Sequence, residues 1–365
     1  MPSLPSRRAF FSLALVAGLA HAGAAFASDA HPNDVARFLA GLPPAAGSPL
    51  EALTADPGWR HHASHLDNAW QRIENSQLSH VRNWSAANLP KPNRTLLYMF
   101  SGPDYLYARN FFPHADTYLF SGLEAPGSTP NLAAMPPEDR QRGLDTLRSS
   151  IRNILWTSFF VTADMQKDLH GQGFLGVLPV LYVFLARSGM EIRSVTHHRL
   201  TDEGALEPVP EPRPTRPAVM QITFYDRPNA TERTLYYFSV DLSNAGLQNG
   251  AFLKFLDRQG PSDAFIKSAS YLVHTAGFSR IRNAILERST RIVQDDTGVR
   301  LDDYDPAVWQ ITPFGRYVRP ISSFDHMFQP SMDQLYQTAN PPALTFRLGY
   351  GYGPHTTSIL LANRR

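Results

Sequence analysis

Acidic residues follow several of the apolar runs in this sequence. They are Asp104, Glu124, Asp241, Asp295 and Asp296. Carboxylates that meet at one edge of a sheet can bind a hard cation or act as a general acid and base. We therefore expect catalytic carboxylates at Asp104, Asp241 and Asp296. The same reasoning predicts a site for a divalent cation, Mg²⁺ or Ca²⁺, with the ligands Asp104, Asp295 and Asp296.

Basic and aromatic residues near these acids complete the predicted site. Lys267 and Tyr271 lie close together in Lys267-Ser268-Ala269-Ser270-Tyr271. We expect Lys267 to be catalytic, and Glu124, Tyr271 and Arg316 to contact a ligand. Arg316 can pair bidentately with a carboxylate or phosphate, or it can neutralise Asp295 or Asp296 inside the fold. The alternative for each acid is a turn former or a helix cap.

Two familiar catalytic patterns are incomplete in this chain. The segment Ser101-Gly102-Pro103-Asp104 lacks the flanking glycines of a hydrolase nucleophile elbow. His61 and His65 are one helical turn apart, but no glutamate follows His61 as in a zinc protease. We therefore interpret Ser101 as a turn residue and the histidines as a solvated cluster.

The spacing of apolar residues predicts the elements that position these groups. A stripe from Leu66 to Trp84 indicates a helix over 61–84, in which Trp70 packs against the rest of the protein. Beyond it, apolar runs and helical stripes alternate, which is typical of an α/β fold. The expected strands are 94–100, 117–120, 190–197, 219–225, 234–240, 264–270 and 290–294, and the expected helices are 138–165, 248–257 and 278–289. We expect a mixed sheet covered by helices on both faces, with an N-terminal helical lead-in, and a ligand at the carboxyl ends of the strands.

Three further segments carry weaker signals. The apolar run 174–186 predicts a buried helix that is kinked at Pro179. The prolines of 208–217 indicate either a long hairpin loop, which we favour, or a connection between domains. The tail around 349–354 is rich in glycine and tyrosine, and indicates loops followed by a final edge strand.

The N-terminus carries the order of regions that defines an export signal. Arg7 and Arg8 precede an apolar run over 11–20, and Ala25-Phe26-Ala27 offers a cleavage site. The paired arginines favour the twin-arginine export machinery and a periplasmic or secreted protein. We therefore divide the chain into a cleaved signal (1–27), a lead-in with its helix (28–93) and an α/β domain (94–365).

Composition limits the classes of partner. The chain has 34 basic and 32 acidic residues, and the signal contains two of the arginines, so the remainder is formally neutral. A neutral chain without basic runs is not expected to bind nucleic acid, and the apolar run of the signal is too short for stable membrane insertion. The sequence has no cysteine, which excludes disulfides and thiolate metal ligands.

Several short blocks resemble a family of exported bacterial hypothetical proteins. The blocks are Phe100-Ser101-Gly102-Pro103-Asp104, Phe111-Phe112-Pro113, Gly122-Leu123-Glu124, Lys267-Ser268-Ala269-Ser270-Tyr271-Leu272, Gln294-Asp295-Asp296-Thr297-Gly298 and Phe314-Gly315-Arg316-Tyr317. The resemblance covers most of the chain after the signal and implies that the blocks belong to one fold. It implies no activity, substrate or cofactor.

Two functions remain open at this point. The first is an exported, soluble small-molecule hydrolase with a carboxylate-rich site at the sheet edge. The second is a periplasmic ligand-binding or scaffolding protein without catalysis. Convergence of at least three of the acids with Lys267 favours the enzyme, and scattered acids favour the alternative.

Overall fold

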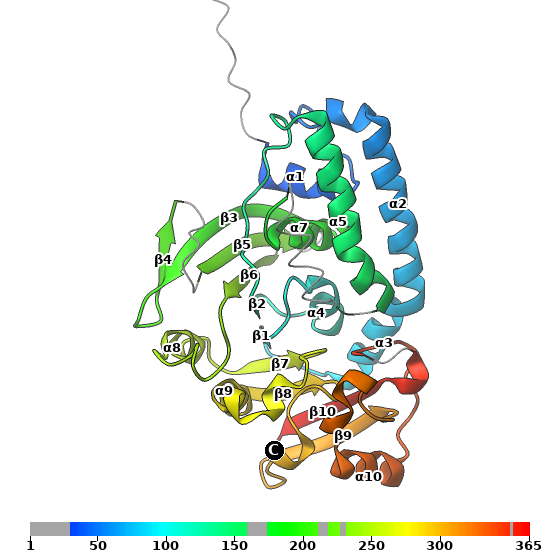
Figure 1. The fold of residues 1–365 in the computed structure, drawn as a ribbon, viewed down its shortest axis with the longest axis vertical. Helices are drawn as coiled ribbons and strands as arrows, with labels where there is room; N and C mark the ends of the chain where they lie inside the picture. Colours follow the sequence, from blue (N-terminus) through cyan, green and yellow to red (C-terminus); the bar gives the residue numbers. More distant parts are fainter. Residues whose placement is uncertain (1–29, 158, 160–173, 211–217, 227–230, 351–352) are drawn as a thin grey trace, which may run out of the picture.

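The predicted α/β fold is confirmed in a computed structural model that describes residues 30–157, 159, 174–210, 218–226, 231–350 and 353–365. These residues form a ten-stranded mixed sheet of order β4-β3-β5-β6-β2-β1-β7-β8-β10-β9 (Figure 1). Its five central strands run parallel: β6 (Thr231–Ser239), β2 (Thr117–Gly122), β1 (Thr95–Tyr98), β7 (Ser262–Ile266) and β8 (Ser289–Gln294). The flanking strands pair antiparallel: β3 (Met190–Leu200), β4 (Leu206–Val209), β5 (Ala218–Asp226), β9 (Trp309–Gly315) and β10 (Ser358–Arg364).

Helices cover both faces of this sheet, as the sequence predicts. One face carries α1 (Pro32–Leu39), α2 (Pro57–Ile73), α3 (Ser79–Asn88), α4 (Tyr105–Phe111), α5 (Pro137–Thr157) and α7 (Leu178–Arg187). The other face carries α8 (Ala251–Asp257) and α9 (Ser279–Arg288). A further helix, α10 (Pro330–Ala339), packs on β9 and β10 at the end of the sheet.

The side chains of β1 show why both faces need a cover. Leu96 and Tyr98 belong to the core under α4, whereas Leu97 and Met99 belong to the core under α9. This alternation follows from the two-residue period of a strand. Apolar residues at every position are therefore typical of a central parallel strand covered on both sides.

The predicted helix over 61–84 is observed as one longer helical rod. It runs through α2, a π-helical turn η2 (Glu74–Leu78) and α3. Trp70 packs against Phe184 of α7, with ring centroids 6.4 Å apart, so the predicted contact with the α/β body is present. Gln77, the polar member of the stripe, is buried and accepts a hydrogen bond of 2.8 Å from the backbone N–H of Arg347.

The described part of the lead-in packs against the main core. Its helix α1 packs against α7, and Phe38 and Leu39 are fully buried in the same core as the sheet. Asp56 caps α2 by accepting from the N–H of Gly58 at 2.7 Å. The lead-in thus contributes to the main core.

Two local predictions are wrong. Pro179 does not kink its helix, because α7 begins at Leu178 and proline is tolerated in a first turn. The last strand, β10, does not form the edge of the sheet, because it lies between β8 and β9.

Of the predicted helix 138–165, the structure describes α5 as far as Thr157, and most of the remainder lies outside the described residues.

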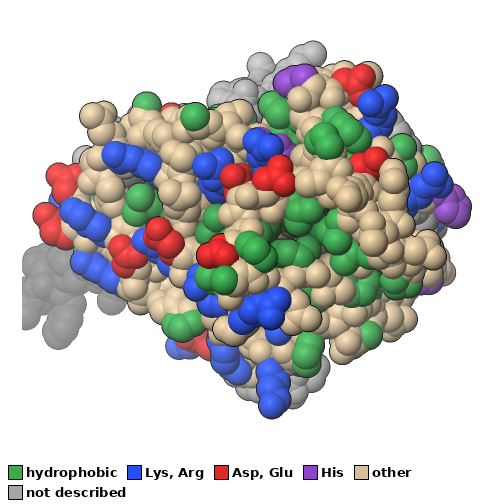
Figure 2. Space-filling model, turned by 90° about the horizontal axis from the view of Figure 1, so that it is seen from below, with side chains coloured by type: hydrophobic (Ala, Val, Ile, Leu, Met, Phe, Trp, Pro, Cys, Tyr) green, Lys and Arg blue, Asp and Glu red, His purple; other side chains and the backbone are tan. Residues whose placement is uncertain are grey.

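The surface gives two further observations. In the described part of the chain, no helix is both long and apolar enough to cross a membrane. On the face that Figure 2 shows, acidic and basic side chains are interspersed with hydrophobic ones rather than gathered by sign. The export signal itself lies outside the described residues.

Candidate functional site

The connections of β1 and β7 leave the sheet in opposite directions. β1 leads to α4 on one face, and the chain after β7 leads to α9 on the other. Neighbouring parallel strands whose connections diverge leave a crevice at their carboxyl ends, where open α/β sheets bind ligands. A cavity of about 170 Å³ lies there, bounded by the loops that follow β1, β2, β6 and β7.

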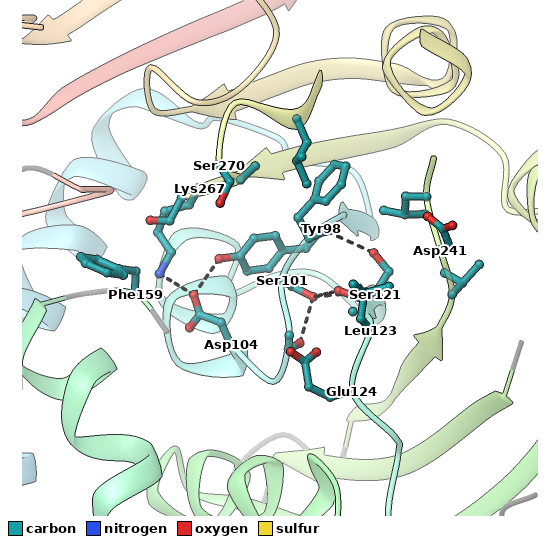
Figure 3. Close-up of a pocket in the computed structure, with 18 of the residues that line it drawn as sticks. Tyr98, Ser101, Asp104, Ser121, Leu123, Glu124, Phe159, Asp241, Lys267 and Ser270 are labelled. Carbon is teal, nitrogen blue, oxygen red and sulfur yellow. Dashed lines mark hydrogen bonds and ion pairs between the residues drawn. The ribbon is translucent and has the colours of Figure 1, made fainter. Parts of the chain in front are cut away.

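A buried ion pair stands at one end of this cavity. Asp104 Oδ2 lies 2.6 Å from Lys267 Nζ and accepts a 2.7 Å hydrogen bond from the Tyr98 hydroxyl (Figure 3). The side chains of Lys267 and Asp104 are only 3% and 2% exposed. Two proton donors therefore meet on one carboxylate oxygen at the wall of a cavity.

Local structure fixes both partners of this pair. Asp104 is the N-cap of α4, and its Oδ1 accepts a 3.0 Å hydrogen bond from the N–H of Tyr107. Lys267 directly follows β7, and its ammonium lies 4.1 Å from the centroid of the Tyr107 ring. The helix cap explains why an acidic residue is found at position 104. It does not explain why the same carboxylate also contacts Lys267 and Tyr98.

Burial opposes charge on both members of the pair. It raises the pKa of Asp104, against the effect of Lys267, which favours the carboxylate. It lowers the pKa of Lys267, against the effects of Asp104 and Asp295. Burial also raises the pKa of Tyr98 well above its ordinary value, and the Asp104 charge adds to this, so the hydroxyl keeps its proton. Opposed shifts bring an acid and a base closer in proton affinity, which is the condition for proton transfer between them.

The backbone around the cavity is strained. Ser268, Ser270 and Tyr271 have φ of 52°, 50° and 55°, and Phe100 on the opposite loop has φ of 62°. Positive φ is uncommon for residues other than glycine, and such conformations cluster at functional sites. The Ser268 hydroxyl oxygen is buried at the cavity and has no hydrogen-bond partner among the described residues.

The remainder of the cavity wall is largely apolar. The rings of Phe100 and Phe278 are in tilted contact, with centroids 6.0 Å apart, and Leu242 and Leu272 also line the cavity. The cavity thus combines an apolar wall with a polar end that carries Asp104 and Lys267. Such a combination is typical of small-molecule sites, in which a few polar groups orient a mostly apolar ligand.

Glu124 also lines the cavity, as expected. It is buried, and the Tyr237 hydroxyl lies 3.1 Å from its carbonyl oxygen and 3.3 Å from Oε2. A Cβ at Gly122 would lie 2.5 Å from that hydroxyl and 2.6 Å from Glu124 Oε2. Glycine is therefore required at position 122 for this wall to pack as it does.

Asp241 lies at the opposite end of the cavity from the ion pair (Figure 3). It is exposed, and its carboxylate accepts hydrogen bonds of 2.9 Å from both the N–H and the hydroxyl of Ser243. This arrangement matches the turn-forming alternative. Asp104, Glu124 and Asp241 thus line one cavity with Lys267, although Asp104 alone of the three acids contacts the lysine.

The two adjacent acids after β8 point to different partners. The carboxylate of Asp295 accepts hydrogen bonds from the backbone N–H groups of Ser268 and Thr297, at 2.8 and 2.9 Å. Asp296 accepts a hydrogen bond from the hydroxyl of Tyr271. The Tyr271 side chain is buried and is not among the residues that line the cavity. Burial, with the Asp295 charge, raises the pKa of Asp296 to about 7. Asp296, which is half-buried, and Tyr271, which is buried, therefore form a second cluster next to the cavity.

The described residues contain no group of three or more histidine, aspartate or glutamate side chains placed to hold a metal ion. Asp104 is engaged by Lys267 and Tyr98, and Asp295 by backbone N–H groups. A cation bound by Asp104, Asp295 and Asp296 remains a prediction from the sequence.

Arg316 is not where the sequence places it. It is exposed and lines a separate surface pocket with Asp333 and His355, and it forms no ion pair with Asp295 or Asp296. The physical reason is the topology, because β9, which ends at Gly315, is the edge strand on the far side of β10. The expectation that Arg316 neutralises these acids is wrong.

Sequence reasoning missed Tyr98 and Ser121. Tyr98 is the last residue of β1, and within an apolar run its type indicates a core aromatic residue rather than a polar contact. Ser121 is fully buried and interlocks with Ser101: its N–H donates to Ser101 Oγ at 3.2 Å, and its own hydroxyl accepts from the N–H of Phe100 at 3.1 Å. Ser101 is thus a structural turn residue, as the missing elbow indicates.

Comparison of the sequence with models of protein families and with curated proteins finds no match. The geometry of the cavity therefore carries the functional conclusion.

Proposed function

We propose that this chain is an exported small-molecule hydrolase whose acid–base pair is Asp104–Lys267. The observation that supports the proposal most strongly is a fully buried ion pair that borders a cavity at the carboxyl ends of parallel strands. A buried ion pair adds little to the stability of the folded protein, because the cost of desolvating both charges offsets their attraction. A reaction that needs both a proton acceptor and a cation gives a reason for the pair.

The roles follow from the chemistry of the groups. A substrate carbonyl or phosphoryl oxygen placed near Lys267 would have its developing negative charge stabilised by the ammonium. Asp104 would take a proton from the attacking water, and Lys267 would return a proton to the leaving group. The hydroxyl of Tyr98 would hold the carboxylate in position, and the apolar wall around Phe100 and Phe278 would hold the body of the substrate.

The proposal is tested by turnover of chromogenic esters, amides, glycosides and phosphate monoesters. We expect the parent to hydrolyse one of these classes, and the double variant Asp104→Asn/Lys267→Met to lose about 100-fold or more. The double variant is the informative one because it removes both charges of the pair together. Lys254→Met and Asp325→Asn, on the surface, are matched controls that keep parental rates. Equal rates in the parent and the double variant contradict the assigned roles.

One observation favours a binding protein as the second candidate. Asp104 already accepts from Lys267, Tyr98 and Tyr107, and Asp241 is engaged by Ser243, so these acids are satisfied without a ligand. A binding protein would show saturable thermal stabilisation by a member of the same panel, with no product formed. Product formation that depends on Asp104 and Lys267 excludes this candidate.

The proposed location rests on the N-terminal signal. Replacement of Arg7 and Arg8 by lysine should block export if the twin-arginine machinery carries the protein. Cell fractionation with an antibody against the mature chain measures this, and the expected mature N-terminus is Ser28. Unimpaired export of the double lysine variant contradicts the route, and a protein that stays in the cytoplasm contradicts export itself.

The divalent cation has a separate test. If Asp104, Asp295 and Asp296 bind Mg²⁺ or Ca²⁺, either ion should raise the melting temperature of chelator-treated protein. The Asp296→Asn variant should lose this increase. An unchanged melting temperature in the parent contradicts the cation site and leaves the roles of Asp104 and Lys267 untouched.

A further inference from the structure

A second cavity, lined by three arginines, lies on the helical side of the molecule. Its volume is about 270 Å³, and it is bounded by the rod of α2, η2 and α3, the end of α4 and the end of α7. The polar residues that matter here are Arg82, Arg109, Arg187, Glu74, Asn110 and Ser188. The lining contains three guanidinium groups and one carboxylate, and two further carboxylates, Asp67 and Asp226, pair with Arg187 and Arg109 from outside it. We call it the arginine pocket.

Two of the arginines are held rigidly by the fold. Arg187 is 7% exposed at its side chain, with Nε donating to the Ala40 carbonyl at 2.7 Å and Nη1 2.5 Å from Asp67. Its Nη2 is buried next to Gly41, where a Cβ would lie 3.3 Å away, and has no hydrogen-bond partner among the described residues. Arg109 donates to the Pro113 carbonyl at 2.6 Å, and its nearest acid, Asp226, is 3.6 Å away. Rigid guanidinium groups lose little entropy when an anion binds.

The third arginine is paired with the acid of the pocket. Both Nη atoms of Arg82 contact the Glu74 carboxylate, and Nη1 also donates to Asn110 Oδ1 at 2.8 Å. Glu74 is the first residue of the π-helical turn η2. Turns of this kind inside α-helices are frequent at functional sites. The Glu74 carboxylate thus occupies a two-point arginine site that an external oxyanion can also use.

We infer that the arginine pocket binds a small oxyanion, a phosphate or carboxylate group, between Arg82, Arg109 and Arg187. The planar guanidinium group matches both kinds of oxyanion in geometry and in charge. Glu74 competes with the ligand for Arg82 and so sets the affinity. The pocket is distinct from the cavity at the sheet edge, because Asp104 and Arg109 stand at opposite ends of α4.

Calorimetric titration with inorganic phosphate and with citrate, at constant ionic strength, tests this inference in the whole protein. We expect binding of at least one anion, weakened about tenfold or more by Arg82→Gln. Glu74→Gln should tighten binding severalfold, because it removes a competing and repelling charge. Binding of phosphate alone assigns a phosphate group, and binding of citrate alone assigns a carboxylate.

The controls separate this site from general charge effects. Arg142→Gln, on the exposed face of α5, removes the same charge elsewhere and should bind like the parent. The double variant Asp104→Asn/Lys267→Met should also bind normally, so failure of the hydrolase proposal leaves this one standing. Absence of binding up to about 10 mM of either anion, or equal affinities in the parent, Arg82→Gln and Glu74→Gln, overturns the inference.

Discussion

Asp104 and Asp296 both lie beyond the carboxyl ends of parallel strands, at the same edge of the sheet. Their surroundings differ in the charge of the nearest group. Asp104, after β1, has the Lys267 ammonium at 2.6 Å, whereas Asp296, after β8, has the Tyr271 hydroxyl and a second carboxylate, Asp295, beside it. Burial raises the pKa of both acids. A cation opposes that rise at Asp104, and a like charge reinforces it at Asp296. The same pattern in the sequence, an acid after an apolar strand, therefore gives two different electrostatic sites.

The largest expected effect is loss of the cation from the first site. Lys267→Met leaves Asp104 buried without a compensating charge, which should cost about 3–5 kcal/mol of unfolding free energy at neutral pH. Urea denaturation followed by circular dichroism measures the change. The double variant Asp104→Asn/Lys267→Met should recover most of the loss, because the asparagine keeps the cap on α4 and both charges of the pair are removed together.

A control shows whether that loss belongs to the pair. Lys254→Met removes an exposed lysine whose ammonium donates to the Asp202 carbonyl, and we expect a change below about 1 kcal/mol. If Lys267→Met is equally mild, Asp104 and Lys267 do not form a charged pair in the folded protein.

The next effect concerns the wall of the cavity. Gly122→Ala places a methyl group 2.5 Å from the Tyr237 hydroxyl and 2.6 Å from Glu124 Oε2, so these groups must move. We expect a loss of about 1–3 kcal/mol in urea denaturation together with weaker binding of any cavity ligand. Gly277→Ala is the matched control, because its nearest neighbour is 3.8 Å away. Equal stabilities of the two variants would show that the wall at Gly122 is loosely packed.

The smallest effect has the opposite sign and depends on pH. The folded protein holds the Asp296 proton up to about pH 7, whereas the unfolded chain releases it near its ordinary value of 3.8. The parent should therefore lose stability as pH rises from about 4 to about 7, and Asp296→Asn should lose less, because the pKa values of Asp104 and Asp295 are still raised. At about pH 8 the variant should be more stable by roughly 1–2 kcal/mol, an amount reduced by partial solvent exposure. Thermal melts at both pH values measure this, and a variant less stable than the parent at high pH contradicts it.

Much of the architecture could be predicted from the sequence because its signals are local. Apolar runs and helical stripes located β1, β2, β7 and β8, together with α5, α7, α8 and α9 but not α4, and the alternation of these elements indicated the α/β fold. Because parallel strands end at one edge, Asp104, Glu124, Asp241 and Lys267 were expected together, and all four line the cavity. This part of the site followed from topology alone.

The features that could not be predicted depend on the order of the strands in the sheet and on contacts between residues distant in the sequence. Nothing local distinguishes β10 as an interior strand, so the positions of β9 and Arg316 could not be predicted. Tyr98 looked like a core residue because its ring packs in the core and only its hydroxyl reaches Asp104. The direction of Asp296 toward Tyr271 depends on the left-handed conformation of Tyr271, which the sequence does not reveal.

The central claim is that Lys267, paired with Asp104, meets small molecules in the cavity. The sequence has four lysines, Lys91, Lys167, Lys254 and Lys267, so the side-chain amines of ¹⁵N-lysine protein give few NMR signals. We predict that the Lys267 signal, assigned by its absence in the double variant, titrates with a pKa below 10.5, the ordinary value for a lysine side chain, and shifts when a turned-over or bound compound is added. A Lys267 signal that titrates at or above 10.5 and stays unchanged across the whole panel of esters, amides, glycosides and phosphates would contradict both the charged pair and its contact with small molecules.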